Sequence, residues 1–198
     1  MKKSWIGILM IIIGAAIIIG ALSMRYEANK VQKIMIEDFK KNIQKVDEQL
    51  GVSESTKVEV KKPLENKQGT IGIISIPKIE LNVALSEGVD VETLKYAVGH
   101  FTSTPMPGDK GNFCVAGHRS YSYNEYFNRL DELVIGDKIT VTTLNGEFIY
   151  EVYESKVVSP EETSVLDNTA SSEITLVTCT PIRVATHRLI VKGRIMIK

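Results

Sequence analysis

The chain has 198 residues, of which 43% are hydrophobic and 24% are charged, and its 24 basic and 24 acidic residues cancel at pH 7. This composition is that of a globular protein and excludes a disordered or repetitive chain. Balanced charge gives no overall field that attracts nucleic acid, so we expect no nucleic-acid partner.

The N-terminus carries an apolar run, residues 5–22, that contains no charged residue. At about 1.5 Å per residue this run spans a hydrocarbon core of roughly 30 Å. A cleaved signal peptide has a shorter apolar core and a small-residue cleavage site, and residues 20–23 match such a site poorly. Lys2 and Lys3 favour a cytoplasmic N-terminus, but Arg25 and Lys30 follow the run, so the charge bias alone decides little. We therefore expect residues 1–24 to be an uncleaved, single-pass signal anchor.

Residues 25–68 differ in composition from the run before them. Apolar residues at helical spacing predict a helix that ends near Gly51, and they are Val31, Ile34, Met35, Phe39, Ile43, Val46 and Leu50. Residues 53–68 are polar, contain Pro63 and show no periodicity, which indicates a linker. We expect a helical stalk and tether that hold the following domain off the membrane. The alternative is a regulatory segment that packs over a functional site.

Residues 69–198 contain many short strand patterns separated by turn signals. Strands are expected at residues 70–76, 79–84, 112–116, 138–143, 147–158 (as one strand or two), 173–178 and 189–197. Short helices are expected at 91–96, with Asp90 as N-cap, and at 125–130. Asn145-Gly146 is a hairpin signal. Many strands with little helix between them predict an all-β fold, a closed antiparallel-rich barrel.

The residues with catalytic chemistry lie near the last two strands. Cys179 follows the strand pattern of residues 173–178, and Pro181 cannot continue the ladder because it lacks an N–H. Nine residues after the thiol, Arg188 opens the final strand, so a hairpin would set a guanidinium beside the thiol. Such a cation favours a thiolate or stabilises an oxyanion. His118 is the best candidate for a base, and together these residue types suit Cys/His acyl transfer.

Other residues of the same types have plainer interpretations. His187 adjoins Arg188, and successive strand residues point to opposite faces, so only one of the two can face Cys179. Cys114 lies in an apolar strand pattern and is interpreted as a small core residue, although a disulfide with Cys179 is possible. Arg119 and Arg183 are interpreted as solvated or structural.

Three blocks of this chain, in this order, resemble the sortases, the cysteine transpeptidases of the Gram-positive cell wall. The blocks are Ala116-Gly117-His118-Arg119, Thr175-Leu176-Val177-Thr178-Cys179, and Arg188 nine positions later, and Gly99-His100 and residues 107–112 also match. The resemblance covers roughly residues 69–198 and implies an eight-stranded sortase-type β-barrel.

The resemblance also assigns roles to residues. It implies that Cys179 is the nucleophile, His118 the general acid/base, and Arg188 the stabiliser of substrate and oxyanion. Thr178 is expected to help hold the substrate or the oxyanion, and His100 to be supporting structure. The implied reaction cleaves a Leu-Pro-x-Thr-Gly or -Ala sorting signal after Thr and joins the protein to a peptidoglycan amine through a thioacyl intermediate.

The match is best to class D sortases, with classes A and C as alternatives. No Asp-Pro-aromatic lid motif is present, and Ile182-Arg183-Val184-Ala185 stands where pilus-type sequences carry Tyr-Gly-x-Asn. The loop of residues 159–172 is too short for the inserted helix of class B. The expected partners are exported proteins with a C-terminal sorting signal, a peptidoglycan amine and the membrane, with the catalytic domain extracellular.

Alternative functions remain from the sequence alone. One is a pilus-polymerising sortase that uses a lysine amine, another is a non-catalytic, membrane-tethered peptide-binding module, and a third is a hydrolytic cysteine protease. No cofactor or metal is expected. Some sortases bind calcium through acidic residues in a loop like that of Glu161 and Glu162, but adjacent glutamates are more often simply solvated.

Overall fold

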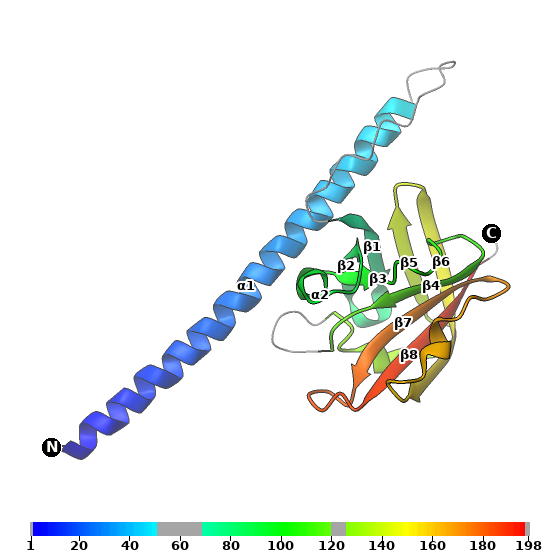
Figure 1. Cartoon of the computed structure of the whole chain (residues 1–198). Coiled ribbons are helices and arrows are strands. Elements are labelled where there is room, and N and C mark those ends of the chain that lie inside the picture. The colour runs from blue at the N-terminus through cyan, green and yellow to red at the C-terminus, as the bar shows by residue number, and fades with distance from the viewer. Residues whose placement is uncertain (1, 51–68, 120–125, 197–198) are drawn as a thin grey trace.

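The computed structural model describes residues 2–50, 69–119 and 126–196, and it consists of one long helix beside a barrel (Figure 1). The helices are α1 (Lys2–Leu50) and α2 (Val91–Tyr96), with short 3-10 helices η1 (Pro77–Ile79), η2 (Leu130–Glu132) and η3 (Thr163–Leu166). The strands are β1 (Thr70–Ile76), β2 (Leu81–Glu87), β3 (Val98–His100), β4 (Gly111–Ala116), β5 (Lys138–Thr143), β6 (Gly146–Val158), β7 (Ser172–Thr180) and β8 (His187–Ile195).

The eight strands close into a barrel in the order β1-β2-β3-β4-β7-β8-β6-β5. Strands β2 and β3 run parallel, as do β4 and β7, and the other neighbours are antiparallel. Alternate residues point inward and fill the barrel with large apolar side chains, among them Ile74, Leu85, Phe113, Tyr150, Leu176 and Val191. The all-β, eight-stranded closed barrel expected from the sequence is confirmed.

The strand directions give the barrel two distinct ends. Strands β1, β4, β6 and β7 finish at the end that holds Cys179, and β2, β5 and β8 begin there. We call this the Cys179 end. The opposite end, called the far end, carries the turn between β5 and β6, which includes Leu144.

Several expected elements differ in detail. The second strand begins at Leu81 and not at residue 79, because Pro77 opens a 3-10 turn that closes with Glu80 at a φ of 54°. Residues 147–158 lie in one 13-residue strand, β6. The helix expected at 125–130 is absent from its described part, where residues 126–129 form a turn before η2. The three-residue strand β3 was not expected.

The N-terminal helix also differs from the expected stalk. Helix α1 is continuous from Lys2 to Leu50, and Ala28, Met35 and Phe39 on one face of it are buried. Met35 packs with Ala84 of β2 and with Ala97, so this part of the helix lies on the barrel and does not stand away from it. The expected linker, residues 53–68, lies outside the described residues.

Candidate active site

Cys179 and Arg188 face each other across the last hairpin. They are direct register partners of β7 and β8, and His187 is paired instead with Thr180. Directly opposite residues of an antiparallel pair project on the same face. The register therefore confirms that Arg188, and not His187, shares the face of Cys179. The Cys179 side chain is half-buried, and the Arg188 guanidinium donates to the carbonyls of Ala185 at 3.3 Å and His187 at 3.0 Å.

His118 reaches the same end of the barrel from strand β4. Ala116 and Val177 are register partners on the parallel strands β4 and β7, and the Gly117 N–H donates to the Val177 carbonyl at 3.1 Å. His118 and Cys179 each lie two residues beyond that pair, so the two residues lie at the same level along the neighbouring strands. Within the described residues, no hydrogen bond joins the side chains of His118, Cys179 and Arg188.

The backbone of the histidine segment is held closely. Phe127 donates its N–H to the His118 carbonyl at 3.2 Å, and its ring packs on Gly117. A Cβ on Gly117 would approach Cδ2 of that ring to 2.6 Å, which is far inside van der Waals contact. Glycine is therefore required at 117 for His118 to lie at this place.

Arg119 is a central support of the site, and it is buried, with 5% of its side chain exposed. Its Nε donates to the Asn128 carbonyl at 3.1 Å, its Nη1 to the Thr180 hydroxyl at 2.9 Å, and its Nη2 pairs with Asp131 at 2.8 Å. The sequence left open whether Arg119 is solvated or structural, and the structure shows that it is structural. Its acceptors come from distant parts of the chain, so no local pattern identified them.

Thr178 occupies the inner face of β7, next to Cys179 but pointing the other way. Its side chain is 2% exposed, and its hydroxyl donates to the Gly117 carbonyl at 2.7 Å. This burial favours a positioning role, tying β7 to the histidine segment, over the contact with substrate or oxyanion expected from the sequence.

The surroundings of Arg188 include an acidic side chain. Glu161, on the exposed loop between β6 and η3, has a lowered pKa, first because the Ser159 hydroxyl and a backbone N–H donate to it, and to a smaller extent because the Arg188 guanidinium brings positive charge. Within the described ranges, no group of three or more His, Cys, Asp or Glu side chains gathers as a metal site requires.

The second cysteine has a different environment. Both Cys114 and Cys179 are free thiols. Cys114 is fully buried, and its sulfur donates to the Asn112 carbonyl at 3.4 Å. Burial raises the pKa of the Cys114 thiol to about 12, which keeps it protonated at neutral pH. Cys114 is therefore an unsuitable nucleophile.

His100 lies at the opposite end of its strand from the site. It is 2% exposed, with Nδ1 at 3.0 Å from a Glu87 carboxylate oxygen and Nε2 at 3.0 Å from the Thr104 hydroxyl. The Thr104 hydroxyl also accepts from the Cys114 N–H at 3.1 Å. His100 thus fixes the loop between β3 and β4.

The sortase domain family matches residues 74–196 of the chain. Sortase D of Bacillus subtilis is 34% identical over 111 residues, which cover 56% of this chain and 54% of that protein. Sortase A of Listeria monocytogenes is 28% identical over 205 residues, covering 98% of this chain and 92% of that protein.

Solved structures of sortases also superpose on this chain. A Clostridium perfringens Sortase D5 transpeptidase superposes with a TM-score of 0.66 and 34% identity, covering 84% of this chain and 99% of that one. Sortase C1 of GBS Pilus Island 1 superposes with a TM-score of 0.65 and 26% identity, covering 90% of this chain and 92% of that one.

Proposed function

Because the chain belongs to the sortase family of cysteine transpeptidases, we propose that it anchors exported proteins to the cell wall. The acyl donor is a Leu-Pro-x-Thr-Gly or -Ala sorting signal, cut after Thr, and the acceptor is a peptidoglycan amine. Cys179 is the nucleophile, His118 the general acid/base and Arg188 the stabiliser of substrate and oxyanion. The observation that carries these assignments is that β4, β7 and β8 bring the three residues to one end of the barrel.

The first half-reaction forms the acyl-enzyme. The Cys179 thiolate attacks the Thr carbonyl carbon, and the electron pair of the C=O bond moves onto oxygen, beside the Arg188 guanidinium. Collapse of this intermediate breaks the C–N bond, and His118 gives its proton to the departing amine. The products are a thioester on Cys179 and a free amino terminus on the leaving fragment.

The second half-reaction reverses these roles. The acceptor amine attacks the thioester carbonyl and His118 accepts its proton. The C–S bond then breaks, which returns the thiolate and completes a new amide bond. All these steps use side chains of this chain, so we propose that no cofactor is needed, and an assay with and without a calcium chelator tests that point.

We propose further that α1 anchors the enzyme in the cell membrane by a single pass with the barrel outside. Within the described residues, α1 is long and apolar enough to cross a membrane by its length and composition. Lys2 and Lys3 before the apolar run favour a cytoplasmic N-terminus, but Arg25 and Lys30 after it weaken that bias. The proposed wall-anchoring reaction itself requires the barrel on the outer face.

The test uses the full chain in detergent, mixed with a Leu-Pro-x-Thr-Gly peptide with and without an added amine. Intact mass and peptide mapping should find a thioacyl adduct on Cys179 that disappears as a ligated peptide forms. Cys179→Ala should form no adduct, whereas the matched Cys114→Ala should form it. An adduct released only by water would indicate a hydrolase, and no adduct across a panel of sorting peptides would favour a binding module.

A second acceptor is favoured by one observation. The similar structure of Sortase C1 comes from a pilus island, and a pilin lysine is an amine like that of peptidoglycan. Competition between a peptidoglycan stem or cross-bridge peptide and a lysine-bearing pilin-like peptide separates these acceptors, since the preferred amine dominates the ligated product.

A further inference from the structure

Helix α1 continues without a break from its apolar run onto the barrel. The large apolar side chains of residues 8–22, including Ile8, Ile12 and Leu22, are exposed in the structure. The helix remains regular through Arg25 and beyond, to Leu50. A rigid helix that both crosses a membrane and packs on a domain fixes the distance of that domain from the membrane surface and its orientation relative to that surface.

The packing of α1 on the barrel is specific. Ala28, Gln32, Met35 and Phe39 recur at spacings of four, three and four, and all four are buried. The Gln32 side-chain amide donates to the Tyr96 carbonyl, and its Oε1 accepts from the Ala84 N–H at 3.1 Å. Strand β3 pairs with β2 only from Leu85 onward, so Gln32 satisfies a strand edge that β3 leaves open.

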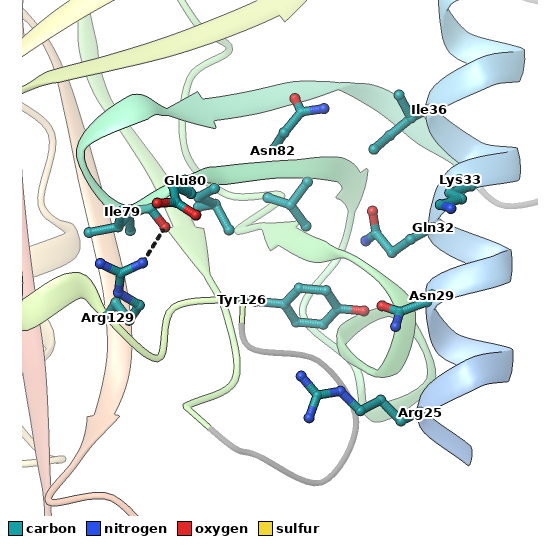
Figure 2. Close-up of a pocket in the computed structure, with 12 residues that line it drawn as sticks. Arg25, Asn29, Gln32, Lys33, Ile36, Ile79, Glu80, Asn82, Tyr126 and Arg129 are labelled. Atoms are coloured by element: carbon teal, nitrogen blue, oxygen red, sulfur yellow. Dashed lines mark hydrogen bonds between the residues drawn. The ribbon is translucent and has the colours of Figure 1, made fainter. Parts of the chain in front are cut away.

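The contacts of α1 after its apolar run are with the Cys179 end and the middle of β2. Arg25 and Asn29 line a hollow of about 630 Å³ together with Tyr126 and Arg129, which follow the His118 segment in the chain (Figure 2). Arg129 itself donates to the carbonyl of Ile79 at the Cys179 end. Further along α1, Gln32 reaches Ala84 in the middle of β2, which runs from the Cys179 end toward the far end. Gln32 and Ile36 line the same hollow, so these contacts place this part of α1 beside the Cys179 end of the barrel.

Figure 1 shows which way the barrel faces, since the loop between β7 and β8 lies toward the N-terminal end of α1 and the β5–β6 turn toward its C-terminal end. Arg25 lies about 5 Å, and Phe39 about 25 Å, along the helix axis from Leu22. A headgroup layer is about 5–8 Å thick. If α1 leaves the hydrocarbon core near Leu22, Arg25 is level with the headgroups, and the hollow that Arg25 lines at the barrel lies next to them.

We propose that α1 seats the barrel on the lipid surface, with the Cys179 end against the headgroup layer of the leaflet that the helix leaves. The inference rests on the membrane anchoring proposed above. It adds an interaction surface, residues 181–186 of the β7–β8 loop, whose partner is a lipid headgroup layer. Arg183 and Val184 are exposed at this loop, and a cation beside an aliphatic side chain suits that boundary.

This arrangement restricts what the site can reach. Acyl donor and acceptor amine approach Cys179 from the plane of the membrane surface, at a height that α1 sets. The barrel cannot turn away while Gln32 and its buried neighbours hold the helix.

The test places a fluorescent label at each end of the barrel in the full chain. Val184→Cys and Leu144→Cys are matched, since both replace exposed aliphatic residues, with 66% and 49% of the side chain exposed. The background carries Cys179→Ser, and Cys114 is buried, so only the new thiol is labelled. Vesicles of phosphatidylcholine and phosphatidylglycerol carry a nitroxide quencher on some headgroups.

The label at Val184 should be strongly quenched and the label at Leu144 little. A seven-residue helical insertion after Met24 raises the barrel by about 10 Å and turns it by only about 20°. This insertion should abolish most of the quenching at Val184. A chain that fails to sediment with the vesicles contradicts membrane anchoring itself. A chain that sediments while Val184 is unquenched, or while Leu144 is the quenched site, overturns only the seating proposed here.

Discussion

The Arg119 guanidinium donates a 2.9 Å hydrogen bond to the Thr180 hydroxyl, and so it joins the residue after His118 to the residue after Cys179. The same guanidinium is held by the Asn128 carbonyl and by Asp131. The planar fork of arginine spreads its donors over three nitrogen atoms in fixed directions, whereas a lysine ammonium carries its three donors on one atom. Arg119 therefore acts on the spacing of the proposed base and nucleophile without being a catalytic residue itself.

The first prediction concerns this spacing. Arg119→Ala should lower the rate of thioacyl formation by about 10- to 100-fold, because displacements near 1 Å cost that much in positioned reactions. The loss should fall on kcat more than on KM, because the Arg119 side chain is buried and positions the reacting residues without being one of them. Arg119→Lys should restore only a small part of the rate.

Thr180→Val is the matched control, because it removes one acceptor and leaves Arg119 bonded to Asn128 and Asp131. Its rate should lie between wild type and Arg119→Ala. Thermal unfolding of each variant separates misplacement from unfolding. A folded Arg119→Ala variant with the wild-type rate would contradict the positioning role.

The second prediction concerns the two thiols. Iodoacetamide at pH 8 should alkylate the half-buried Cys179 and leave Cys114 unmodified. Burial holds the pKa of Cys114 at about 12, so only about one Cys114 in ten thousand is a thiolate at that pH. Peptide mapping by mass spectrometry gives the site. Equal modification of the two cysteines in the folded chain would be the contrary result.

The third prediction concerns the helix. Gln32→Ala should lower the free energy of unfolding by about 1–3 kcal/mol, because it leaves the buried Ala84 N–H and the Tyr96 carbonyl without partners. Gln32→Glu should also lower the free energy of unfolding. Its carboxylate can still accept from the Ala84 N–H, but it has no N–H to donate to the Tyr96 carbonyl. Gln44→Ala, at an exposed position of the same helix, should change stability by less than about 0.5 kcal/mol.

Urea unfolding of the full chain in detergent measures these differences. The same interface predicts that a fragment starting at Gly69 unfolds at a lower temperature than one starting at Arg25. Equal stability of Gln32→Ala and Gln44→Ala would show that the helix does not depend on this contact.

Much of the barrel was predictable, because its strands carry their signals locally. Thr70–Ile76 and Lys138–Thr143 were predicted with the bounds observed. Strand β3 was not, since Val98–His100 is too short to show alternation and is a strand only because β2 and β4 flank it. The second strand was expected from residue 79 but begins at Leu81, because the 3-10 turn that Pro77 opens takes up the residues between.

The three proposed reacting residues of the candidate site were predictable from the sequence. The residues that hold them in place, above all Arg119 and its acceptors, were not. Cys179, His118 and Arg188 stand in recognisable local blocks, whereas the acceptors of Arg119 are brought together only by the closed barrel. The docking of α1 was missed for a related reason. Met35 and Phe39 of its buried face belong to the predicted apolar stripe. The buried Gln32 is polar and the apolar Ile34 is 43% exposed, so the stripe alone did not show which face packs on the barrel.

The last prediction concerns acid stability. Glu173 is buried, which alone raises the pKa of its carboxyl, but hydrogen bonds from Tyr153 at 2.7 Å and Ser171 at 2.8 Å, with Arg194 nearby, lower that pKa overall. A carboxyl whose folded pKa lies below its unfolded value of 4.5 stabilises the fold above that pH. The contribution is lost as pH falls through the folded pKa.

Glu173→Gln should therefore be less stable than wild type at pH 7, and the difference should shrink as the pH falls below 4.5. Urea unfolding between neutral and acid pH measures it. Glu151→Gln, at an exposed position of β6, is the matched control and should follow wild type throughout. A constant difference between Glu173→Gln and wild type across this range would mean that its carboxylate is held by packing and not by charge, because loss of packing does not depend on protonation.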